Sequence, residues 1–163
     1  MDNTDRQILA ILQQNARTPN AEIARRVGMA PSAVFERIRK LEERGVIARY
    51  QAVVNPRALG LPLVAFVFVR TAEPPGACDA AVRLAAIPGV QEVHHIAGED
   101  CYLVKVRAAD PEALGRILRE EFGAIGTIRS TRTTIVLETI KETAELPLQP
   151  AAAEEVESEA VHG

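Results

Sequence analysis

Apolar residues recur with helical spacing through the first part of the chain and with strand spacing through much of the rest. Residues 5–14, DRQILAILQQ, place their apolar side chains on one helical stripe, which ends in the turn-forming NARTPN. A short second helix is expected in AEIARRV, with Asn20 as its N-cap and Gly28 as its stop. A third helix is expected from Pro31, and Gly45 is the natural residue to end it. The pattern therefore predicts three helices, the last two joined by a tight turn that contains a glycine.

Beyond Gly45 the pattern predicts strands and two further helices. VIARYQAVV, residues 46–54, is expected to form a strand, the wing of the helical unit, which Asn55–Pro56 ends. The elements expected after it are strands at 63–70, 91–97, 101–107 and 127–140, a helix at about 76–86 and a helix that begins at Asp110. Their order, β-α-β-β-α-β, is that of the ferredoxin-like split βαβ arrangement.

The fold class predicted from these elements is α+β. Residues 1–60 are expected to form a winged helix-turn-helix domain with a linker strand, and residues 61–141 a ferredoxin-like βαββαβ domain. Residues 142–163 are rich in Ala, Glu and Pro without any periodicity, so we expect a disordered acidic tail.

Composition limits the class of protein. Of the 163 residues, 47% are apolar and 25% are charged, as is typical of a soluble globular protein. No apolar run approaches the ~20 residues that a membrane-spanning helix needs. Acidic residues stand where a signal peptide would carry basic ones, so we expect a cytoplasmic protein with no membrane partner. Cys78 and Cys101 supply neither a disulfide framework nor a zinc quartet.

The charge is unevenly distributed along the chain. The net charge is −3, but residues 1–50 hold nine Lys or Arg against six Asp or Glu, whereas residues 141–163 hold one Lys and six Glu. The helical section is therefore locally basic, which is compatible with a nucleic-acid partner.

A sharp turn between two helices, with basic residues on the exposed face of the second, is helix-turn-helix geometry. The third helix would enter the major groove of double-stranded DNA, its N-terminal residues at base edges and its Arg and Lys at phosphates. The predicted DNA-binding residues are Ser32, Ala33, Phe35, Glu36, Arg37, Arg39 and Lys40. The alternative is a solvated basic face on a packing module.

The stretch HHIAGEDCYLV, residues 94–104, gathers potential metal ligands and nucleophiles. Neighbouring strand residues point to opposite faces, so His94 and His95 cannot bind one metal ion, and Cys101 adds too few ligands for a zinc site. Nothing marks the third group or the oxyanion site that a Cys–His nucleophile needs, so we expect neither a metal nor a catalytic site here.

The turn within this stretch has other uses. Gly98 permits backbone conformations that a Cβ forbids and lets a ligand approach closely. Backbone N–H groups of the turn can hold a carboxylate while Glu99 or Asp100 pairs with an ammonium group, so the turn can receive both charges of a free amino acid. On these residues alone, a polar hairpin link is an equal alternative.

DRQILAILQQNAR, EIARRVGMAPSAVFERIRKLEERGVI and HIAGEDCYLVKV, in this order and spacing, resemble the Lrp/AsnC (feast/famine, leucine-responsive regulatory protein) family of transcriptional regulators over residues 2–141. The resemblance implies a DNA-binding winged helix-turn-helix joined to an effector-binding ferredoxin-like domain. It also implies a homodimer that assembles to a tetramer or octamer, and a small effector, often an amino acid, bound near the glycine turn. The effector-binding residues carried over are Gly98, Glu99, Asp100, Cys101, Tyr102, Ser130, Thr131, Thr133 and Thr134.

The sequence departs from the family pattern at two positions. Ala30 stands where a Ser often caps the third helix, which removes a cap worth about 1 kcal/mol unless Ser32 compensates. Cys101 stands where many members have Asp, so Glu99 or Asp100 has to supply the acidic contact.

We therefore expect a sequence-specific DNA-binding regulator that responds to a small effector, expected to be an amino acid, and that is not an enzyme and needs no cofactor. One alternative is a siroheme-decarboxylase-like enzyme of the same fold, suggested by His94 and His95. The other is a ligand-binding assembly module without DNA binding, suggested by Ala30.

Overall fold

The structure, a computed structural model of the chain, describes residues 1–74 and 76–148. It contains two compact units, one formed by residues 1–52 with 142–148 and the other by the described residues of 53–141. Each unit has its own hydrophobic core. Within the described ranges, no helix combines the length and apolar character that crossing a membrane requires.

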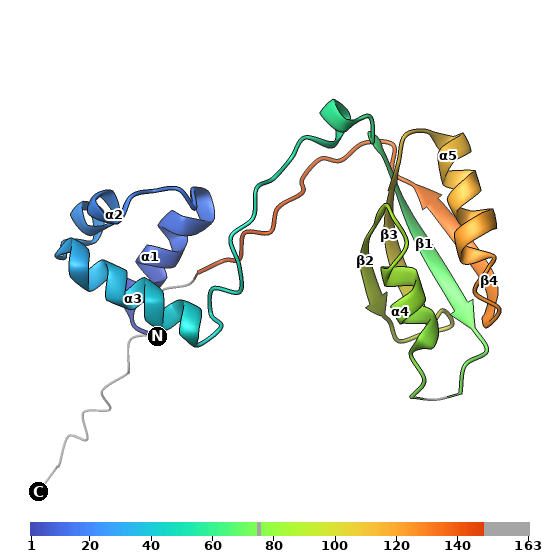
Figure 1. Ribbon diagram of the computed structural model, residues 1–163, viewed down its shortest axis with the longest axis horizontal. Coiled ribbons are helices and arrows are strands. Elements are labelled where there is room, and N and C mark those ends of the chain that lie inside the picture. The colour runs from blue at the N-terminus through green and yellow to red at the C-terminus, as the bar shows by residue number, and fades with distance from the viewer. Residues whose placement is uncertain (75, 149–163) are drawn as a thin grey trace, which may run out of the picture. The chain divides into compact units, whose positions relative to one another are not determined.

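The first unit contains three helices, α1 (Asn3–Gln14), α2 (Asn20–Val27) and α3 (Pro31–Glu43), as predicted (Figure 1). Its core is built around Ile8, Ile23 and Val34, one residue from each helix and each fully buried. Gly28 ends α2 at φ +70°, a left-handed conformation in which glycine avoids the strain of a Cβ. The two helices of the helix-turn-helix are therefore fixed both by packing and by this turn.

The N-cap predicted for α2 is wrong. Asn20 is the first helical residue, and Pro19, which has no side chain able to accept a hydrogen bond, occupies the N-cap position. Proline fits there because its φ of −62° is the value that its ring imposes.

The strand predicted for residues 46–54 is also wrong. Residues 48–55 have no regular secondary structure, and Val53 is 99% exposed. A strand needs a neighbour to pair its backbone groups, and no other described segment of the chain pairs with this one. The described helical unit thus has no wing strand, and a single 3-10 turn, η1 (Pro56–Leu59), follows the extended segment.

The second unit has the predicted β-α-β-β-α-β order. All strand pairs are antiparallel, and the sheet order is β2-β3-β1-β4. The elements are β1 (Leu63–Thr71), α4 (Asp79–Ala85), β2 (Val90–His95), β3 (Tyr102–Ala108), α5 (Pro111–Arg116) with its π-helical continuation η2 (Ile117–Phe122), and β4 (Ile128–Ile135). Asp110 caps α5 as expected, its carboxylate accepting a hydrogen bond from the Ala113 N–H at 2.7 Å.

Two elements are shorter than predicted. The helix expected at 76–86 spans 79–85, and the strand expected to reach residue 140 ends at Ile135. Ile135 pairs with Ala65, and the Val136 N–H still donates to Val64 O at 2.9 Å, so the pairing continues almost to Leu63, where β1 begins. Leu137 is accordingly 99% exposed.

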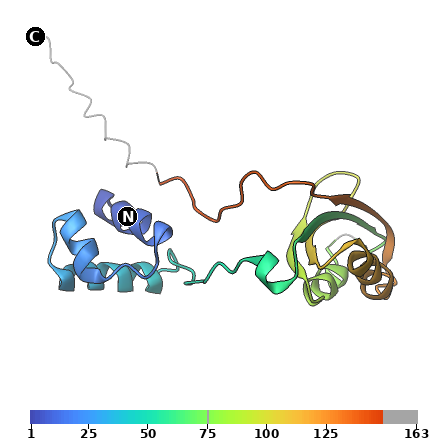
Figure 2. The same cartoon turned by 90° about the horizontal axis from the view of Figure 1, so that it is seen from above.

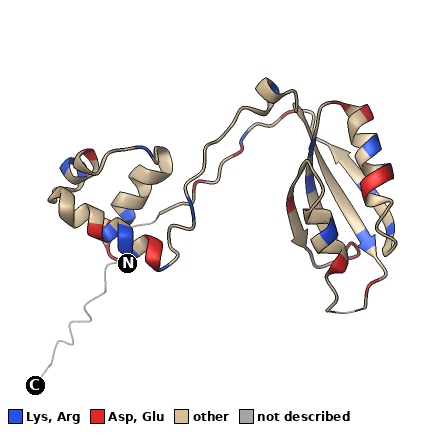
Figure 3. Cartoon of the chain, in the orientation of Figure 1, with Lys and Arg blue, Asp and Glu red and all other residues tan. Residues whose placement is uncertain are grey.

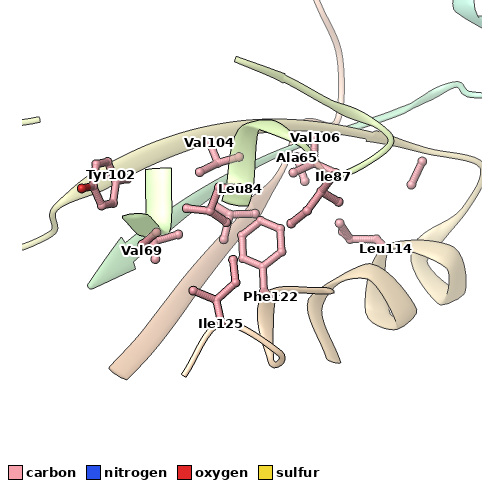
Figure 4. Packing of buried hydrophobic residues seen from close by; sticks show 13 residues of the cluster. Ala65, Val69, Leu84, Ile87, Tyr102, Val104, Val106, Leu114, Phe122 and Ile125 are labelled. Carbon is pink, nitrogen blue, oxygen red and sulfur yellow. The ribbon is translucent and has the colours of Figure 1, made fainter. Parts of the chain in front are cut away.

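Both helices of the second unit cover the same face of the sheet (Figure 2). Side chains from the helices and from the strands meet in one core, where Leu84 and Phe122 pack against the row that contains Val69 and Val104 (Figure 4). The opposite face carries no helix. Phe66, Phe68 and Leu103 alternate with the core residues along β1 and β3, and they are only half-buried.

The segment expected to be a disordered tail is described only as far as residue 148. Residues 142–148 form neither helix nor strand, but they are attached to the first unit through Gln13 and Leu146. The remaining residues, 149–163, lie outside the described part of the chain.

Candidate functional site

Helix α3 presents most of the predicted DNA-binding residues to solvent. Its inner face is buried through Val34, Ile38 and Leu41. Ala33 and Arg37 are half-buried, and the exposed members of the predicted set are Ser32, Phe35, Glu36, Arg39 and Lys40.

The helix begins without a side-chain cap. Ala30 occupies the N-cap position, and no side chain accepts a capping hydrogen bond there, so Ser32 does not compensate for the missing serine. Pro31 at the first helical position lessens this loss, since it has no N–H to leave unpaired.

Arg37 is engaged within the protein. Its Nη1 donates hydrogen bonds to Asp2 and Asp5, each at 2.7 Å, and its side chain is 31% exposed. Asp2 and Asp5 also form the capping box that begins α1, because each carboxylate accepts a hydrogen bond from the backbone N–H of the other residue. Arg37 therefore ties the start of α1 to the middle of α3.

The hydrogen bonds of this cluster shift the pKa values of Asp2 and Arg37. The Asp5 N–H and, secondarily, the Arg37 guanidinium lower the pKa of Asp2 below its usual range. The same carboxylates raise the pKa of Arg37. Asp2 and Arg37 are therefore both charged at neutral pH.

The other predicted phosphate-binding arginine, Arg39, also has acidic neighbours. Its guanidinium donates to Glu36 at 2.9 Å and to Glu43, both on α3. On α2, Arg25 and Arg26 share Glu22, whose pKa falls to about 2 because both guanidinium groups donate to it. Acidic and basic positions lie side by side on α3 (Figure 3).

Lys40 and Arg44 differ from these arginines. Both are exposed, and neither side chain has a hydrogen-bonding or ionic partner among the described residues. They are four residues apart at the C-terminal end of α3, so their side chains project from the same side of the helix. These two residues are the cations of α3 that remain available to an external anion.

The glycine turn lies between β2 and β3, as predicted. Gly98 has φ +136°, and a Cβ added to it would meet no atom within 4 Å. The turn is attached to the sheet by two backbone hydrogen bonds, Cys101 N–H to Val69 O at 2.8 Å and Ile96 N–H to Cys101 O at 3.0 Å. It is therefore fixed at its end and open around its glycine.

The Cys101 side chain faces β1. Its half-buried Sγ accepts a hydrogen bond from the Thr71 N–H at 3.5 Å. Tyr102, which follows, is buried at 4% exposure, and its hydroxyl donates to Glu73 at 3.4 Å. Burial, and then the Glu73 carboxylate, raises the pKa of Tyr102. Tyr102 therefore belongs to the core side of the sheet.

The four predicted residues of β4 divide between the two faces of the sheet. Ser130 and Thr134 pair with Arg70 and Phe66, on the face without helices. Thr131 and Thr133 pair with Val69 and Val67, on the helix-covered face. Ser130 and Thr134 therefore share the face of Arg70, whose side chain contacts the turn, and Thr131 and Thr133 lie on the opposite face.

Two arginines that sequence reasoning missed lie at this turn. Arg70 donates to Glu99 at 3.2 Å, and Arg132 donates to Asp100 at 3.2 Å. Arg132 also stacks over the ring of Phe68, with its Cζ 3.9 Å from the ring centroid. The only sequence signal for them was a positive charge within each of two strands, because strand register cannot be deduced from one sequence.

The histidines diverge, as their adjacency predicts. His94 contacts Glu92 at 3.1 Å, whereas the His95 ring lies 5.3 Å from the ring of Tyr102, on the other face. Among the described residues, no three His, Cys, Asp or Glu side chains come together as a metal site would require.

Comparison with known proteins covers both units. Residues 1–42 match the family model described as an AsnC-type helix-turn-helix domain, and residues 64–146 match the Lrp/AsnC ligand binding domain. The chain is 38% identical, over 149 residues, to the HTH-type transcriptional regulator FL11 of Pyrococcus horikoshii, covering 91% of this chain and 97% of the relative.

Two solved structures are similar over nearly the same extent. One is a transcriptional regulator from Neisseria meningitidis in complex with L-methionine, with TM-score 0.84, 31% identity and coverage of 91% of this chain and 97% of the other. The second is a feast or famine regulatory protein from M. tuberculosis complexed with L-methionine, with TM-score 0.82, 36% identity and coverage of 89% and 97%.

The Asp2–Arg37 contact predicts a pH-dependent stability of the helical unit. The folded pKa of Asp2 lies below its ordinary value of about 3.9, so the contact stabilises the folded state above that value and is lost as the pH falls through the lower folded pKa. We expect Asp2→Asn to lower the urea midpoint at pH 7 and to lower it less at pH 2.

Fluorescence of Tyr50 in a Tyr102→Phe background reports on this unit, since Tyr50 bonds to Glu42 of α3. Asn3→Ala, an exposed change in the same helical turn, is the control and should show no such pH dependence. An equal loss at both pH values would contradict the assignment.

Proposed function

The chain belongs to the Lrp/AsnC family of transcriptional regulators, and from that premise we propose that it binds double-stranded DNA through α3 under the control of a free amino acid. The observation that carries this proposal is the exposed surface of α3, where Lys40 and Arg44 have no partner among the described residues. The role proposed is regulatory rather than catalytic.

On DNA, the N-terminal residues of α3 approach base edges in the major groove. Ser32 is exposed and can donate or accept a hydrogen bond, and Phe35, 54% exposed, can contact a thymine methyl group. Lys40 and Arg44 contact phosphates, which fixes register without reading sequence. Arg37 is not part of this interface in our proposal, because it stabilises the helical unit instead.

The effector proposed for the turn is a zwitterion. Asp100 and Glu99 offer carboxylates for its ammonium group, and Arg132 and Arg70 offer guanidinium groups for its carboxylate. The open space around Gly98 lets the ligand approach the backbone. The methionine complexes of two relatives support an amino acid as the ligand class.

Binding a zwitterion requires the existing ion pairs at the turn to separate. The Arg70–Glu99 pair is largely exposed, at 46% and 93%, and an exposed pair contributes about 0–1 kcal/mol. Separating it therefore costs little, and each partner regains an opposite charge from the ligand. The Arg132–Asp100 pair is less exposed on its acidic side, at 20%, so it gives the firmer of the two anchors.

We further propose that the chain forms homodimers through the helix-free face of the sheet and that the dimers assemble into tetramers or octamers. Phe66, Phe68 and Leu103 gather on that face and are only half-buried in the single chain. A sheet with helices on one face buries its second apolar face against another element, and a second copy supplies one.

Replacing Lys40 tests the DNA contact. Lys40→Ala should weaken binding to every duplex and reduce the slope of log K against log salt by about 1, since one phosphate contact is lost. Fluorescence anisotropy across a salt series measures this, with Lys141→Ala as the matched control. An unchanged slope in Lys40→Ala would refute the proposed interface.

Replacing Gly98 tests the effector site. The protein is screened with L-methionine and the other free amino acids, each at millimolar concentration, for a rise in its melting temperature. A ligand at 100 times its dissociation constant stabilises the native state by about 2.7 kcal/mol, which gives a measurable rise. Gly98→Val should abolish the rise.

Gly60→Val is the control for this variant, because Gly60 also has a positive φ and open space around it but lies after η1. A rise that survives in Gly98→Val would place the ligand elsewhere.

A charge on the open sheet face tests assembly. Leu103→Asp should convert the protein to a monomer in sedimentation velocity, because burying a carboxylate against an apolar partner surface is costly. Val82→Asp, on an α4 position that is 65% exposed, should leave the assembly unchanged. Dimers or larger species that persist in Leu103→Asp would rule out this face as the interface.

A further inference from the structure

The C-terminal segment is held against helix α1 by a two-point contact. The Gln13 side-chain amide donates to Leu146 O at 3.0 Å, and its carbonyl oxygen accepts from Leu146 N–H at 2.8 Å. Both backbone polar groups of Leu146 are thereby engaged by a single glutamine. Leu148, the last described residue, therefore belongs to the helical unit.

The segment is attached to α1 within the same unit as α3. Leu12, the neighbour of Gln13, lines a cavity of about 260 Å³ whose wall also includes Phe35, Arg39 and Tyr50. Phe35 and Arg39 belong to the predicted DNA-binding set. The tail therefore begins in the unit that contains the helix that we propose to enter the major groove.

The residues after Leu148 carry charge of the opposite sign to the available groups of α3. Residues 149–163 include four glutamates, at 154, 155, 157 and 159, and no Lys or Arg. Lys40 and Arg44 have no acidic partner within the described ranges, and Arg17, four residues after Gln13, has no ionic one. The acids of the tail outnumber the unpaired cations of α3.

The first acidic residue of the tail follows Leu148 by about the length of α3. Six extended residues, the separation of Leu148 and Glu154, span about 20 Å. A helix of 13 residues, the length of α3, is also about 20 Å long. A tail of this length can thus extend along the whole of α3.

We propose that residues 149–163 bind the DNA-facing surface of α3 in the same chain and compete there with DNA phosphates. This inference rests on the proposed DNA binding and adds a built-in competitor to it. Because the tail is tethered at Leu146, its effective concentration at α3 is of millimolar order, so weak ionic contacts suffice. Salt screens these contacts as it screens those to phosphate.

The first experiment compares affinities for a duplex of arbitrary sequence at roughly 50 mM and roughly 300 mM salt. The proteins are the full chain, a chain that ends at Leu148, and a full-length chain with Glu154, Glu155, Glu157 and Glu159 changed to Gln. Both variants should bind about tenfold more tightly at low salt, as expected if a millimolar effective concentration meets a dissociation constant of about 0.1 mM. The gain should shrink at high salt.

The second experiment needs no DNA. Mass spectrometry follows acetylation of Lys40 by an amine-reactive reagent, with Lys105, whose side chain is 13% exposed, as the internal control. Lys40 should react more slowly in the full chain than in the Glu→Gln chain, and Lys105 equally in both. Gln13→Ala, which removes the attachment of Leu146, should give an intermediate Lys40 rate.

The two experiments separate the two proposals. If no protein binds the duplex at low salt, the proposed DNA binding fails, and the Lys40 rates still decide the tail contact. Equal Lys40 rates in the full and Glu→Gln chains would overturn the tail contact, as would a truncated chain that gains affinity while the Glu→Gln chain does not. An unchanged rate in Gln13→Ala alone would overturn the anchoring step.

Discussion

Strand β1 is bonded on both of its edges, to β3 and to β4, and this double pairing determines where the residues around the glycine turn lie. Val69 faces Tyr102 on one side and Thr131 on the other, so these three side chains form one row on the covered face. The next residue, Arg70, then falls on the open face beside the turn. A shift of β1 by one residue would exchange the two faces and remove both the core and the basic groups at the turn.

A comparable constraint acts in the helical unit, but it is ionic. Arg37 lies on the helix that we propose to contact DNA, yet its guanidinium joins the two carboxylates that begin α1. Asp5 is nearly buried, at 9% exposure, and a buried carboxylate is costly without a partner. The helix-turn-helix therefore uses one of its basic residues for folding, and a count of Arg and Lys on α3 overstates its charge toward DNA.

The sequence predicted the elements and their order because hydrophobic periodicity is a local property. Val34, Ile38 and Leu41 of α3, and the alternating residues of β3, are buried as their spacing requires. The sequence did not predict the absence of the wing strand, the arginines at the turn or the ion pairs of Arg37, because each depends on residues distant in the chain. The strand expected at 46–54 has the composition of a strand but no described neighbour to pair with, and Arg70 and Arg132 meet the turn only through register. The placement of Arg37 depended likewise on a carboxylate 32 residues away.

Because α3 has few unpaired cations, the DNA affinity that we propose depends on how many copies assemble. If Lys40 and Arg44 are the phosphate contacts of one chain, two counterions are released per copy, and log K falls with log salt by a slope of about −1.8. Such a chain binds DNA weakly alone at physiological salt. A dimer doubles the slope to about −3.6, and each further dimer adds as much again if its helices reach the duplex. Affinity then depends steeply on the number of copies held together, so a ligand that alters assembly through the sheet domain can control DNA binding without any contact to α3.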